Sequence, residues 1–394
     1  FATSVTVGAV LLAGCGSTAT PSPTSPPASA SASPSSPVSS IDKTQPMPQD
    51  ATARIDQAAK AALKDNPDNT PGLWVAVWDP KVGYYEAAYG DAVAATTKAT
   101  TADHNWIGSI TKTVFATAVL QQVAAGTLAL DDTVATVDPD LAAKYPSIAD
   151  ITVRGLLGMV SGIADYADAA VAELVVDQTL TFTRDDLIKL GLAAGKQEPV
   201  GTLAYSTTNY IILGNMLETM TGQSPEELVN DVFAQAGMTQ SMLPAQASAL
   251  PDPATHGYMG AVEATQFKEL NSDVTASTDV TDWSFDYAKE GGGAYSVIGD
   301  LATWGGTCLG QSLLPADMAE ARLKTHTSES LGEYGLGMRV LDGGWIGHDG
   351  QVVGWNADVQ CNTTTGAVFA LMSNSTSGLI TASYEVKAVV FPQN

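Results

Sequence analysis

Hydrophobic runs that are typical of strands lie near both ends of the sequence. LWVAVWD (residues 73–79) follows a Pro-Gly turn, and YYEAAYG (84–90) is typical of its antiparallel partner. Four later stretches predict further strands, at residues 334–341, 344–349, 354–361 and 367–374. No internal repeat is visible, which argues against a repeat architecture.

Between these ends, apolar residues recur at helical spacing. Residues 109–125 are apolar on nearly every face and end at Gly126, as expected for a buried helix. Other helices are predicted at residues 51–63, 151–157, 184–192, 210–220, 224–233, 298–309 and 379–390. The predicted fold class is α+β: an antiparallel sheet from the N- and C-terminal segments, flanked by helices, with a mainly helical lobe over about residues 127–290.

The first fifty residues differ from the rest in composition. Residues 1–15 contain a short apolar stretch that ends in LAGC, which resembles a lipobox, so Cys15 is a candidate lipidation site. A plain secretory signal with a chance cysteine is the alternative. Residues 16–49 are rich in Pro, Ser, Thr and Ala and predict a disordered tether. The folded domain is then expected over residues 50–394, exported and held on the outer face of the cytoplasmic membrane only through a lipid anchor.

Composition excludes several classes of protein. The net charge of −24 leaves no basic surplus for nucleic acid, and no apolar run is long enough to span a membrane. Four scattered His and three Cys residues match no metal-ligand spacing, so neither metal nor cofactor is expected. In an oxidising compartment Cys308 and Cys361 could pair, although two free buried thiols are an alternative. A monomer is expected.

The head of the predicted buried helix carries the first candidate chemistry. Ser109 and Lys112 are three residues apart, so they share one helix face. Backbone N–H groups at a helix N-terminus favour developing negative charge on Ser109. A desolvated Lys112 would favour its neutral form and could take part in proton transfer. The alternative is an ordinary buried helix with a surface lysine.

Two later segments supply possible partners. Tyr205, in a loop before a helix, could have a pKa depressed by a nearby ammonium and act as a base toward Ser109. His348 could add a hydrogen bond or partial positive charge, Gly350 could let a substrate approach the backbone, and the Gln351 N–H could complete an oxyanion hole. A core tyrosine and a hairpin turn at Asp349-Gly350 are the structural alternatives.

Taken together, these segments resemble the class C β-lactamase and D-alanyl-D-alanine carboxypeptidase family of serine hydrolases. The resemblance extends from about Asp50 to Asn394. Its blocks occur in order as WIGSITKT, ITVRGLLGMVSGIADY, GTLAYSTTNYIILGNMLETMTGQS, GMTQSMLP, GGGAYSVIGDLATW, YGLGMRV and GWIGHDGQVVGW. It implies the serine β-lactamase-like fold.

The resemblance also implies roles for particular residues. Ser109 would be the acylated nucleophile, Lys112 its proton-transfer partner and Tyr205 the base that activates it. His348 takes the place of a lysine common in β-lactamases, and Gln351 would supply the second oxyanion N–H. Further substrate contacts are expected from Arg339, Asp349, Gly350 and Thr207; Arg339 resembles an arginine that meets the terminal carboxylate of a substrate.

One residue departs from the family pattern. Thr207 stands where the family usually has an asparagine that contacts the substrate and orients the lysine. Threonine has one hydroxyl in place of an amide and a carbonyl, and nearby Asn209 is not an assured substitute. The departure weakens the expectation of efficient β-lactam or D-Ala-D-Ala turnover, and some relatives without this asparagine resemble esterases.

Three functions fit these observations. The leading one is an exported serine hydrolase that forms an acyl-serine on a cell-wall D-Ala-D-Ala peptide, a β-lactam or a small ester. The second is a low-turnover, penicillin-recognising binding or sensor lipoprotein, suggested by Thr207. The third is an extracytoplasmic solute-binding protein, which would need no reactive serine.

Overall fold

The computed structural model describes residues 41–64, 70–194, 198–246, 249–376 and 379–392. Residues 1–40, which include the predicted signal segment, most of the predicted tether and Cys15, lie outside the described residues. The helices are α1 (Gln49–Lys64), α2 (Ile110–Ala124), α3 (Val134–Val137), α4 (Pro139–Lys144), α5 (Val153–Leu157), α6 (Ala167–Val176), α7 (Arg184–Ala193), α8 (Thr208–Thr221), α9 (Pro225–Ala236), α10 (Ala261–Phe267), α11 (Lys289–Gly292), α12 (Ile298–Gly306), α13 (Ala316–Arg322) and α14 (Leu379–Val390).

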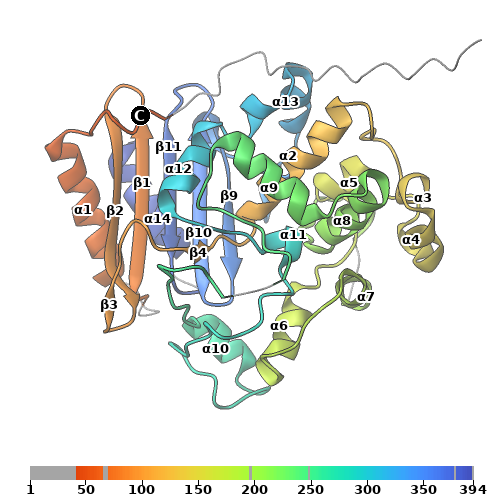
Figure 1. The fold of residues 1–394 in the computed structure, drawn as a ribbon, viewed down its shortest axis with the longest axis horizontal. Coiled ribbons are helices and arrows are strands. Elements are labelled where there is room, and N and C mark those ends of the chain that lie inside the picture. Colours follow the sequence, from red (N-terminus) through yellow and green to blue (C-terminus); the bar gives the residue numbers. More distant parts are fainter. Residues whose placement is uncertain (1–40, 65–69, 195–197, 247–248, 377–378, 393–394) are drawn as a thin grey trace, which may run out of the picture. The chain divides into compact units, whose positions relative to one another are not determined.

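Strands from both ends of the chain form one antiparallel sheet (Figure 1). Within the described residues its order is β3-β2-β1-β11-β10-β9-β8-β7-β6. The two ends meet where β1 pairs with β11, with Leu73 opposite Ser373. The strands are β1 (Gly72–Asp79), β2 (Gly83–Val93), β3 (Thr97–Lys98), β6 (His326–Ser328), β7 (Gly332–Tyr334), β8 (Arg339–Val340), β9 (Trp345–Val352), β10 (Trp355–Asn362) and β11 (Val368–Ser373), beside a separate pair β4 (Asn105–Trp106) and β5 (Tyr295–Ser296). The α+β prediction is confirmed.

Strand β1 is buried on both faces because each face of the sheet carries its own helical cover. Leu73, Val75 and Val77 join a hydrophobic core with residues of α1 and α14. Trp74 and Ala76 point the other way, into the larger core that includes α2 and α12. Helix α2, which follows Ser109 and contains Lys112, is therefore enclosed between the sheet and the helical segments that follow it (Figure 1).

Two predicted elements are shorter than the sequence suggested. The strand expected at residues 334–341 is split into β7 and β8, because Gly337 adopts φ +79° and Gly335 packs against the backbone of Arg322. The helix expected to end at residue 309 stops at Gly306, and Cys308 and Leu309 both have positive φ. Local backbone turns, which hydrophobic periodicity does not report, account for both differences.

Residues 41–49 belong to the folded domain, so the expected tether at 16–49 is too long at its C-terminal end. The Tyr84 N–H donates to Gln45 O at 2.7 Å, and the Met47 N–H donates to Tyr84 O at 3.0 Å. The Met47 side chain is buried in the core beside α1. Met47 and the partly buried Ile41, which packs against the larger core, supply the apolar surface that anchors this mainly polar segment.

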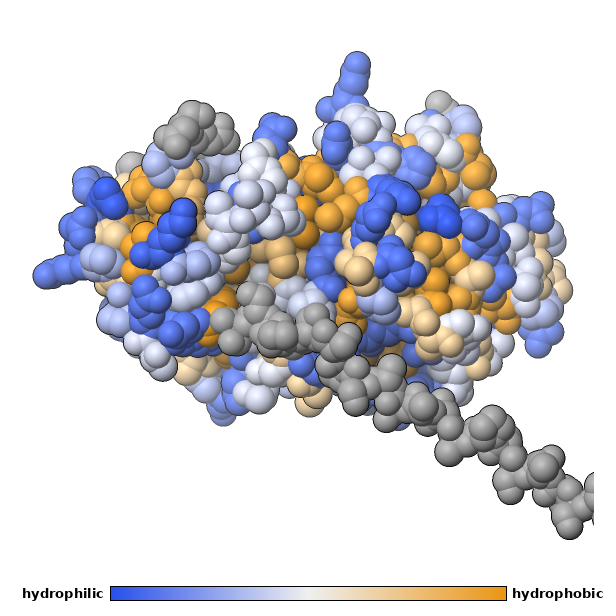
Figure 2. All heavy atoms as spheres, turned by 90° about the horizontal axis from the view of Figure 1, so that it is seen from above, coloured by the Kyte–Doolittle hydropathy of each residue, from blue (hydrophilic) through white to orange (hydrophobic). Residues whose placement is uncertain are grey.

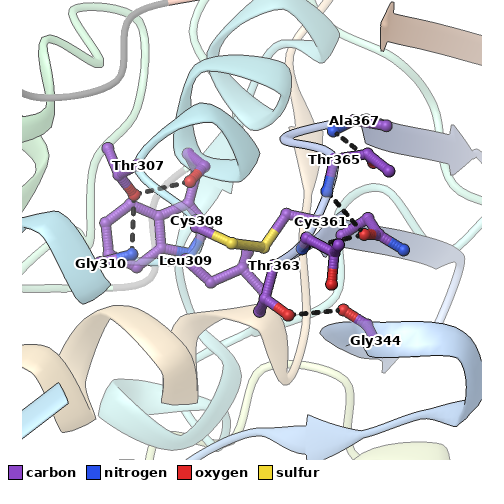
Figure 3. Close-up of a disulfide and its surroundings, with 12 residues drawn as sticks. Thr307, Cys308, Leu309, Gly310, Gly344, Cys361, Thr363, Thr365 and Ala367 are labelled. Carbon is purple, nitrogen blue, oxygen red and sulfur yellow. Dashed lines mark hydrogen bonds between the residues drawn. A yellow bond between two sulfur atoms is a disulfide. The ribbon is translucent and has the colours of Figure 1, made fainter. Parts of the chain in front are cut away.

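Cys308 and Cys361 form a disulfide, with their Cα atoms 5.6 Å apart. Figure 3 shows the bond between the turn that follows α12 and the end of β10. Hydrogen bonds fix the backbone on both sides: Gly310 N–H donates to the Thr307 hydroxyl, and the Thr363 hydroxyl donates to Gly344 O. Of the two alternatives left by the sequence, the structure contains the paired one.

The surface mixes hydrophilic side chains with hydrophobic patches, as Figure 2 shows for one face. The most exposed large apolar side chains include Val176, Val200, Val262 and Leu270. None of the helices in the described ranges has the length and apolar character required to cross a bilayer.

Candidate active site

Ser109 immediately precedes helix α2 and lines a pocket of about 450 Å³. Its hydroxyl makes no capping hydrogen bond to the helix, although serine commonly caps in this way. The hydroxyl is therefore available to partners outside the helix. The first residues of α2 are fully enclosed, so the nucleophile candidate is held on a rigid element.

Lys112 lies one turn along α2, and its side chain is entirely buried. Its Nζ is 2.9 Å from Ser109 Oγ, 2.6 Å from Gly291 O and 3.3 Å from Thr207 Oγ1. Burial lowers the pKa of Lys112 to about 7, although the nearby carboxylates of Asp165 and Asp349 oppose this change. Near neutral pH a large fraction of the amine is therefore uncharged and able to accept a proton.

Tyr205 precedes α8 and reaches the same point, with its ring centre 4.9 Å from Lys112 Nζ. Burial raises the pKa of Tyr205 well above its ordinary value, and a hydrogen bond with Ser109 only partly offsets this increase. The expected depression of the Tyr205 pKa is thus wrong, because desolvation outweighs the hydrogen bond and the carboxylates of Asp165 and Asp349 raise the pKa further. In the free protein the phenol is protonated, and Lys112 is the better base toward Ser109.

His348 lies on β9 and contacts Tyr205, with 6.1 Å between the ring centres. Its Nε2 is 3.0 Å from the Tyr334 hydroxyl, and its Nδ1 bonds to the backbone oxygen of Asp349. Burial lowers the pKa of His348 to about 4, with Lys112 adding to the decrease. The imidazole is neutral at pH 7, so the expected partial positive charge is absent and its role is limited to hydrogen bonding.

Strand β9 passes directly against the turn that carries Ser109. A Cβ atom on Gly108 would lie 2.4 Å from Gln351 N, and one on Gly350 would lie 1.9 Å from Ile107 O. Gly350 therefore admits the backbone of the nucleophile's turn rather than a substrate, which corrects the expectation. The same approach places the backbone nitrogen of Gln351 beside the turn that carries Ser109, as the predicted pair of oxyanion donors requires.

Arg339 and Asp349 form an ion pair at the pocket wall, with Nη1 2.6 Å from Oδ1. Burial of Asp349 is outweighed by His348 and Arg339, so the pKa of that carboxyl is below its ordinary value. Arg339 faces the pocket but already has a counter-ion, so a substrate carboxylate would have to share it. The Gln351 side chain donates to Glu263 Oε1 at 3.0 Å.

Thr207 contacts Lys112, as the family asparagine would, whereas Asn209 does not. Asn209 is fully buried and hydrogen-bonds to Ser161 and to Leu156 O. The Thr207 hydroxyl donates to Asp165 Oδ2 at 3.0 Å while Lys112 donates to it. A Cβ on Gly291 would lie 2.4 Å from Thr207 Cγ2, which explains why this residue is a glycine.

Sequence reasoning missed several residues of the site. Three further acidic side chains line the pocket: Asp165, Asp168 and Glu263. Asp165 lies in the GIADY block that carried part of the family resemblance, so the motif could have signalled it. Nothing in the sequence near Glu263 marks it. In the described ranges, no three His, Cys, Asp or Glu side chains are grouped in a way that could bind a metal ion.

Two arginine side chains support the elements that carry the candidate site. Arg322 is fully buried and donates to Thr113 O, Thr117 Oγ1, Leu309 O and Leu336 O, which secures α2. The second arginine, Arg184, joins α7 to α11 through an ion pair between its Nε and the buried Glu290 Oε1, 2.8 Å apart. This ion pair fixes Glu290, which directly precedes Gly291. The Gly291 carbonyl accepts the hydrogen bond from Lys112.

Comparison with known families matches residues 56–386 to the family described as β-lactamase. The chain belongs to the β-lactamase family. A putative penicillin-binding protein, PbpX of Bacillus subtilis, is 27% identical over 68% of this chain and 61% of its own length. Penicillin-binding protein 4 of Amycolatopsis lactamdurans is 36% identical over 36% of each chain. This chain thus spans less than two thirds of both relatives.

Solved structures agree with this family. A D-stereospecific amidohydrolase from Streptomyces sp. superimposes with a TM-score of 0.70 at 25% identity, covering 87% of this chain and 99% of that one. A D-amino acid amidase from Ochrobactrum anthropi SV3 gives 0.74 at 20% identity, with coverage of 87% and 99%. Together with the family match, these neighbours support a serine hydrolase.

Proposed function

We propose that this chain is an exported acyl-serine amidohydrolase acting on peptides or amides that contain D-amino acids, including cell-wall peptides ending in D-Ala-D-Ala. The observation that carries the proposal is the buried Lys112 amine, 2.9 Å from Ser109 Oγ, whose pKa burial lowers to about 7. This is the arrangement needed to remove a proton from a serine during nucleophilic attack.

The reaction follows from these contacts. Lys112 takes the Ser109 proton while Oγ attacks the carbonyl carbon, and the N–H groups of Ser109 and Gln351 hold the oxyanion. When the tetrahedral intermediate collapses, the Lys112 ammonium returns its proton to the leaving amine, directly or through the Tyr205 hydroxyl. Water then attacks the acyl-serine with its proton taken by the same amine. When the second tetrahedral intermediate collapses, the bond from the acyl carbon to Ser109 Oγ breaks, the Lys112 ammonium returns the proton to Oγ, and the acid product leaves.

The substrate class is supported by the pocket and by the relatives. Both the amidase and the amidohydrolase neighbours act on D-configured compounds by their names. The pocket wall carries Asp165, Asp168 and Glu263 in addition to the Asp349–Arg339 pair, which favours a substrate with a free ammonium group. Amides of D-amino acids and short peptide stems with a free amine have this charge.

Export is supported by two independent features. The Cys308–Cys361 disulfide is typical of proteins that fold in an oxidising compartment. The apolar stretch, the LAGC sequence at Cys15 and the Pro/Ser/Thr/Ala segment fit a lipid-anchored protein of the cell envelope. A monomer and a small-molecule or peptidoglycan-peptide partner complete the proposal.

Intact mass spectrometry tests the function. The protein is incubated with D-alanine amide, a D-Ala-D-Ala peptide, a penicillin and a short-chain activated ester. We expect an adduct on Ser109 and turnover of the D-configured amides, and neither in Ser109→Ala. An adduct of equal yield in Ser109→Ala would overturn the assignment.

The second candidate is a penicillin-recognising protein with low turnover. Tyr205 favours it, because a phenol whose pKa is strongly raised stays protonated and cannot assist Lys112 by taking a proton from the deacylating water. In the same experiment this candidate predicts a penicillin adduct that persists for hours, with no multiple turnover of any amide.

A further inference from the structure

The Thr207 hydroxyl donates one hydrogen bond and accepts another, and its surroundings fix which is which. The hydroxyl donates to Asp165 Oδ2 at 3.0 Å, and the other carboxylate oxygen, Oδ1, accepts the Ala167 N–H at 3.0 Å. An ionised carboxylate is an acceptor only, so both oxygens need donors. The single proton of Thr207 is thereby committed to Asp165, and its Oγ1 can only accept from Lys112.

This fixes the direction of every bond that Lys112 makes. A neutral amine has two N–H groups and one lone pair. The Gly291 carbonyl and the Thr207 oxygen are both acceptors, at 2.6 and 3.3 Å from Nζ, so they take the two N–H groups. The remaining position of Nζ faces Ser109 Oγ at 2.9 Å, and it holds the lone pair.

We propose that Asp165, acting through the Thr207 hydroxyl, is a positioning residue that aims the lone pair of Lys112 at the hydroxyl of Ser109. The inference rests on the acyl-serine function proposed above. When the amine takes the serine proton it becomes an ammonium with three N–H donors, and the same three acceptors satisfy it. The proton therefore moves without rearranging any side chain.

The pairing explains the departure from the family pattern at residue 207. An asparagine has a separate acceptor and donor, so it can present its oxygen to the lysine unaided. A threonine hydroxyl can turn either way, and an acceptor on its far side has to fix it. Thr207 and Asp165 together do what the single family asparagine does.

Other charged groups near Lys112 do not share this geometry. The titratable side chains that face it from the surrounding elements are Asp165, Asp349, His348, Tyr205 and Tyr210. Asp349 pairs with Arg339. Of these five, Asp165 is the carboxylate joined to Lys112 through one intervening hydroxyl.

The test is the rate at which a fluorophosphonate labels Ser109 between pH 5 and 9. The probe needs only an activated serine, so inactivity toward D-amino acid amides would overturn the proposed function without affecting this readout. In Asp165→Asn the amide can accept at only one of the two positions. If its oxygen stays on the Ala167 N–H, its NH₂ group faces Thr207 and turns that hydroxyl toward the Lys112 lone pair.

We expect Asp165→Asn to slow labelling by about 10- to 100-fold, part of the contribution of a general base. The acid limb of the pH profile should also move to lower pH, because the lost carboxylate stabilised the ammonium. In a Thr207→Asn background, the same Asp165→Asn change should slow labelling by less than about threefold. The oxygen of the asparagine is an acceptor only, so it can accept from Lys112 without help from Asp165.

The matched control is Glu173→Gln, which removes a carboxylate from an exposed position of α6, outside the pocket lining and outside this chain of hydrogen bonds. Its acid limb should stay in place. Equal slowing by Asp165→Asn in both backgrounds would overturn the inference, as would an acid limb that stays where it is when Asp165 is replaced. Melting temperatures of all variants show whether slower labelling comes from a loss of folded protein or from a reversed hydrogen bond between Thr207 and Lys112.

Discussion

Replacing Lys112 by methionine should stabilise the protein at neutral pH while abolishing its activity. Lys112 is fully buried without a direct carboxylate partner, and burial lowers its pKa from the ordinary 10.5 to about 7. At 1.36 kcal/mol for each pH unit, holding this group in the folded state costs ~4–5 kcal/mol below pH 7. Methionine has a similar length and no charge to desolvate.

The substitution also removes donors from buried acceptors. The Gly291 carbonyl loses its hydrogen bond from Lys112, which costs ~1–3 kcal/mol in a dry site. The net gain for Lys112→Met at pH 7 is therefore ~2 kcal/mol in the free energy of unfolding. Catalytic sites commonly show this opposition between stability and activity.

The pH dependence tests the reasoning more sharply than the magnitude. Between pH 7 and 10.5 the unfolded chain binds more protons at Lys112 than the folded one, so wild-type stability rises with pH across this window. The gain from Lys112→Met should shrink over the same range. Near pH 10.5 the variant should be the less stable protein, because only the lost hydrogen bonds remain.

Urea unfolding of both proteins at several pH values between 7 and 10.5 measures this difference. Lys268→Met is the matched control, since Lys268 is exposed and the change should stay within ~0.5 kcal/mol at every pH. A Lys112→Met variant that is less stable than wild type at pH 7, or a difference independent of pH, would refute the argument.

Three further predictions concern the site and its support. The acylation rate should fall about tenfold for each pH unit below ~7, as Lys112 becomes protonated, and an acid limb near pH 4 in a pH–rate profile would assign it to another group. Gly350→Ala should reduce Ser109 labelling at least ~100-fold with the circular dichroism spectrum preserved, because its Cβ would meet Ile107 O at 1.9 Å; wild-type labelling would contradict this. Replacing Cys308 and Cys361 by serine should lower the unfolding free energy by ~2–4 kcal/mol in urea titrations, as expected for a cross-link between residues 53 apart, and an unchanged midpoint would disprove it.

Much of the fold could be predicted because the strongest patterns are those of fully buried elements. The run at β1 is buried on both faces and the first turns of α2 on every side, so hydrophobicity alone marks them. The strand expected over residues 334–341 failed because two glycines let the backbone turn toward Arg322. The predicted domain boundary at residue 50 is wrong because two apolar residues, Ile41 and Met47, anchor a mainly polar segment.

In the candidate site, residue identities could be predicted and electrostatic states could not. Ser109, Lys112, Tyr205 and His348 meet in one place, as the motifs suggested. The Tyr205 pKa moves in the opposite direction from the prediction, because it depends on how much water the surrounding elements exclude. Asp165 was missed as a partner of Thr207 because their contact joins residues 42 apart in sequence.

The buried guanidinium of Arg322 has a consequence for the order in which the chain assembles. Its four acceptors come from α2 and from the segments around residues 309 and 336, and no solvent reaches it in the finished protein. Helix α2 can therefore be fully packed only after the C-terminal third of the polypeptide has been synthesised. A truncated or nascent chain that ends before residue 322 would carry the serine without a closed interior behind it, so reactivity should appear only once synthesis is nearly complete.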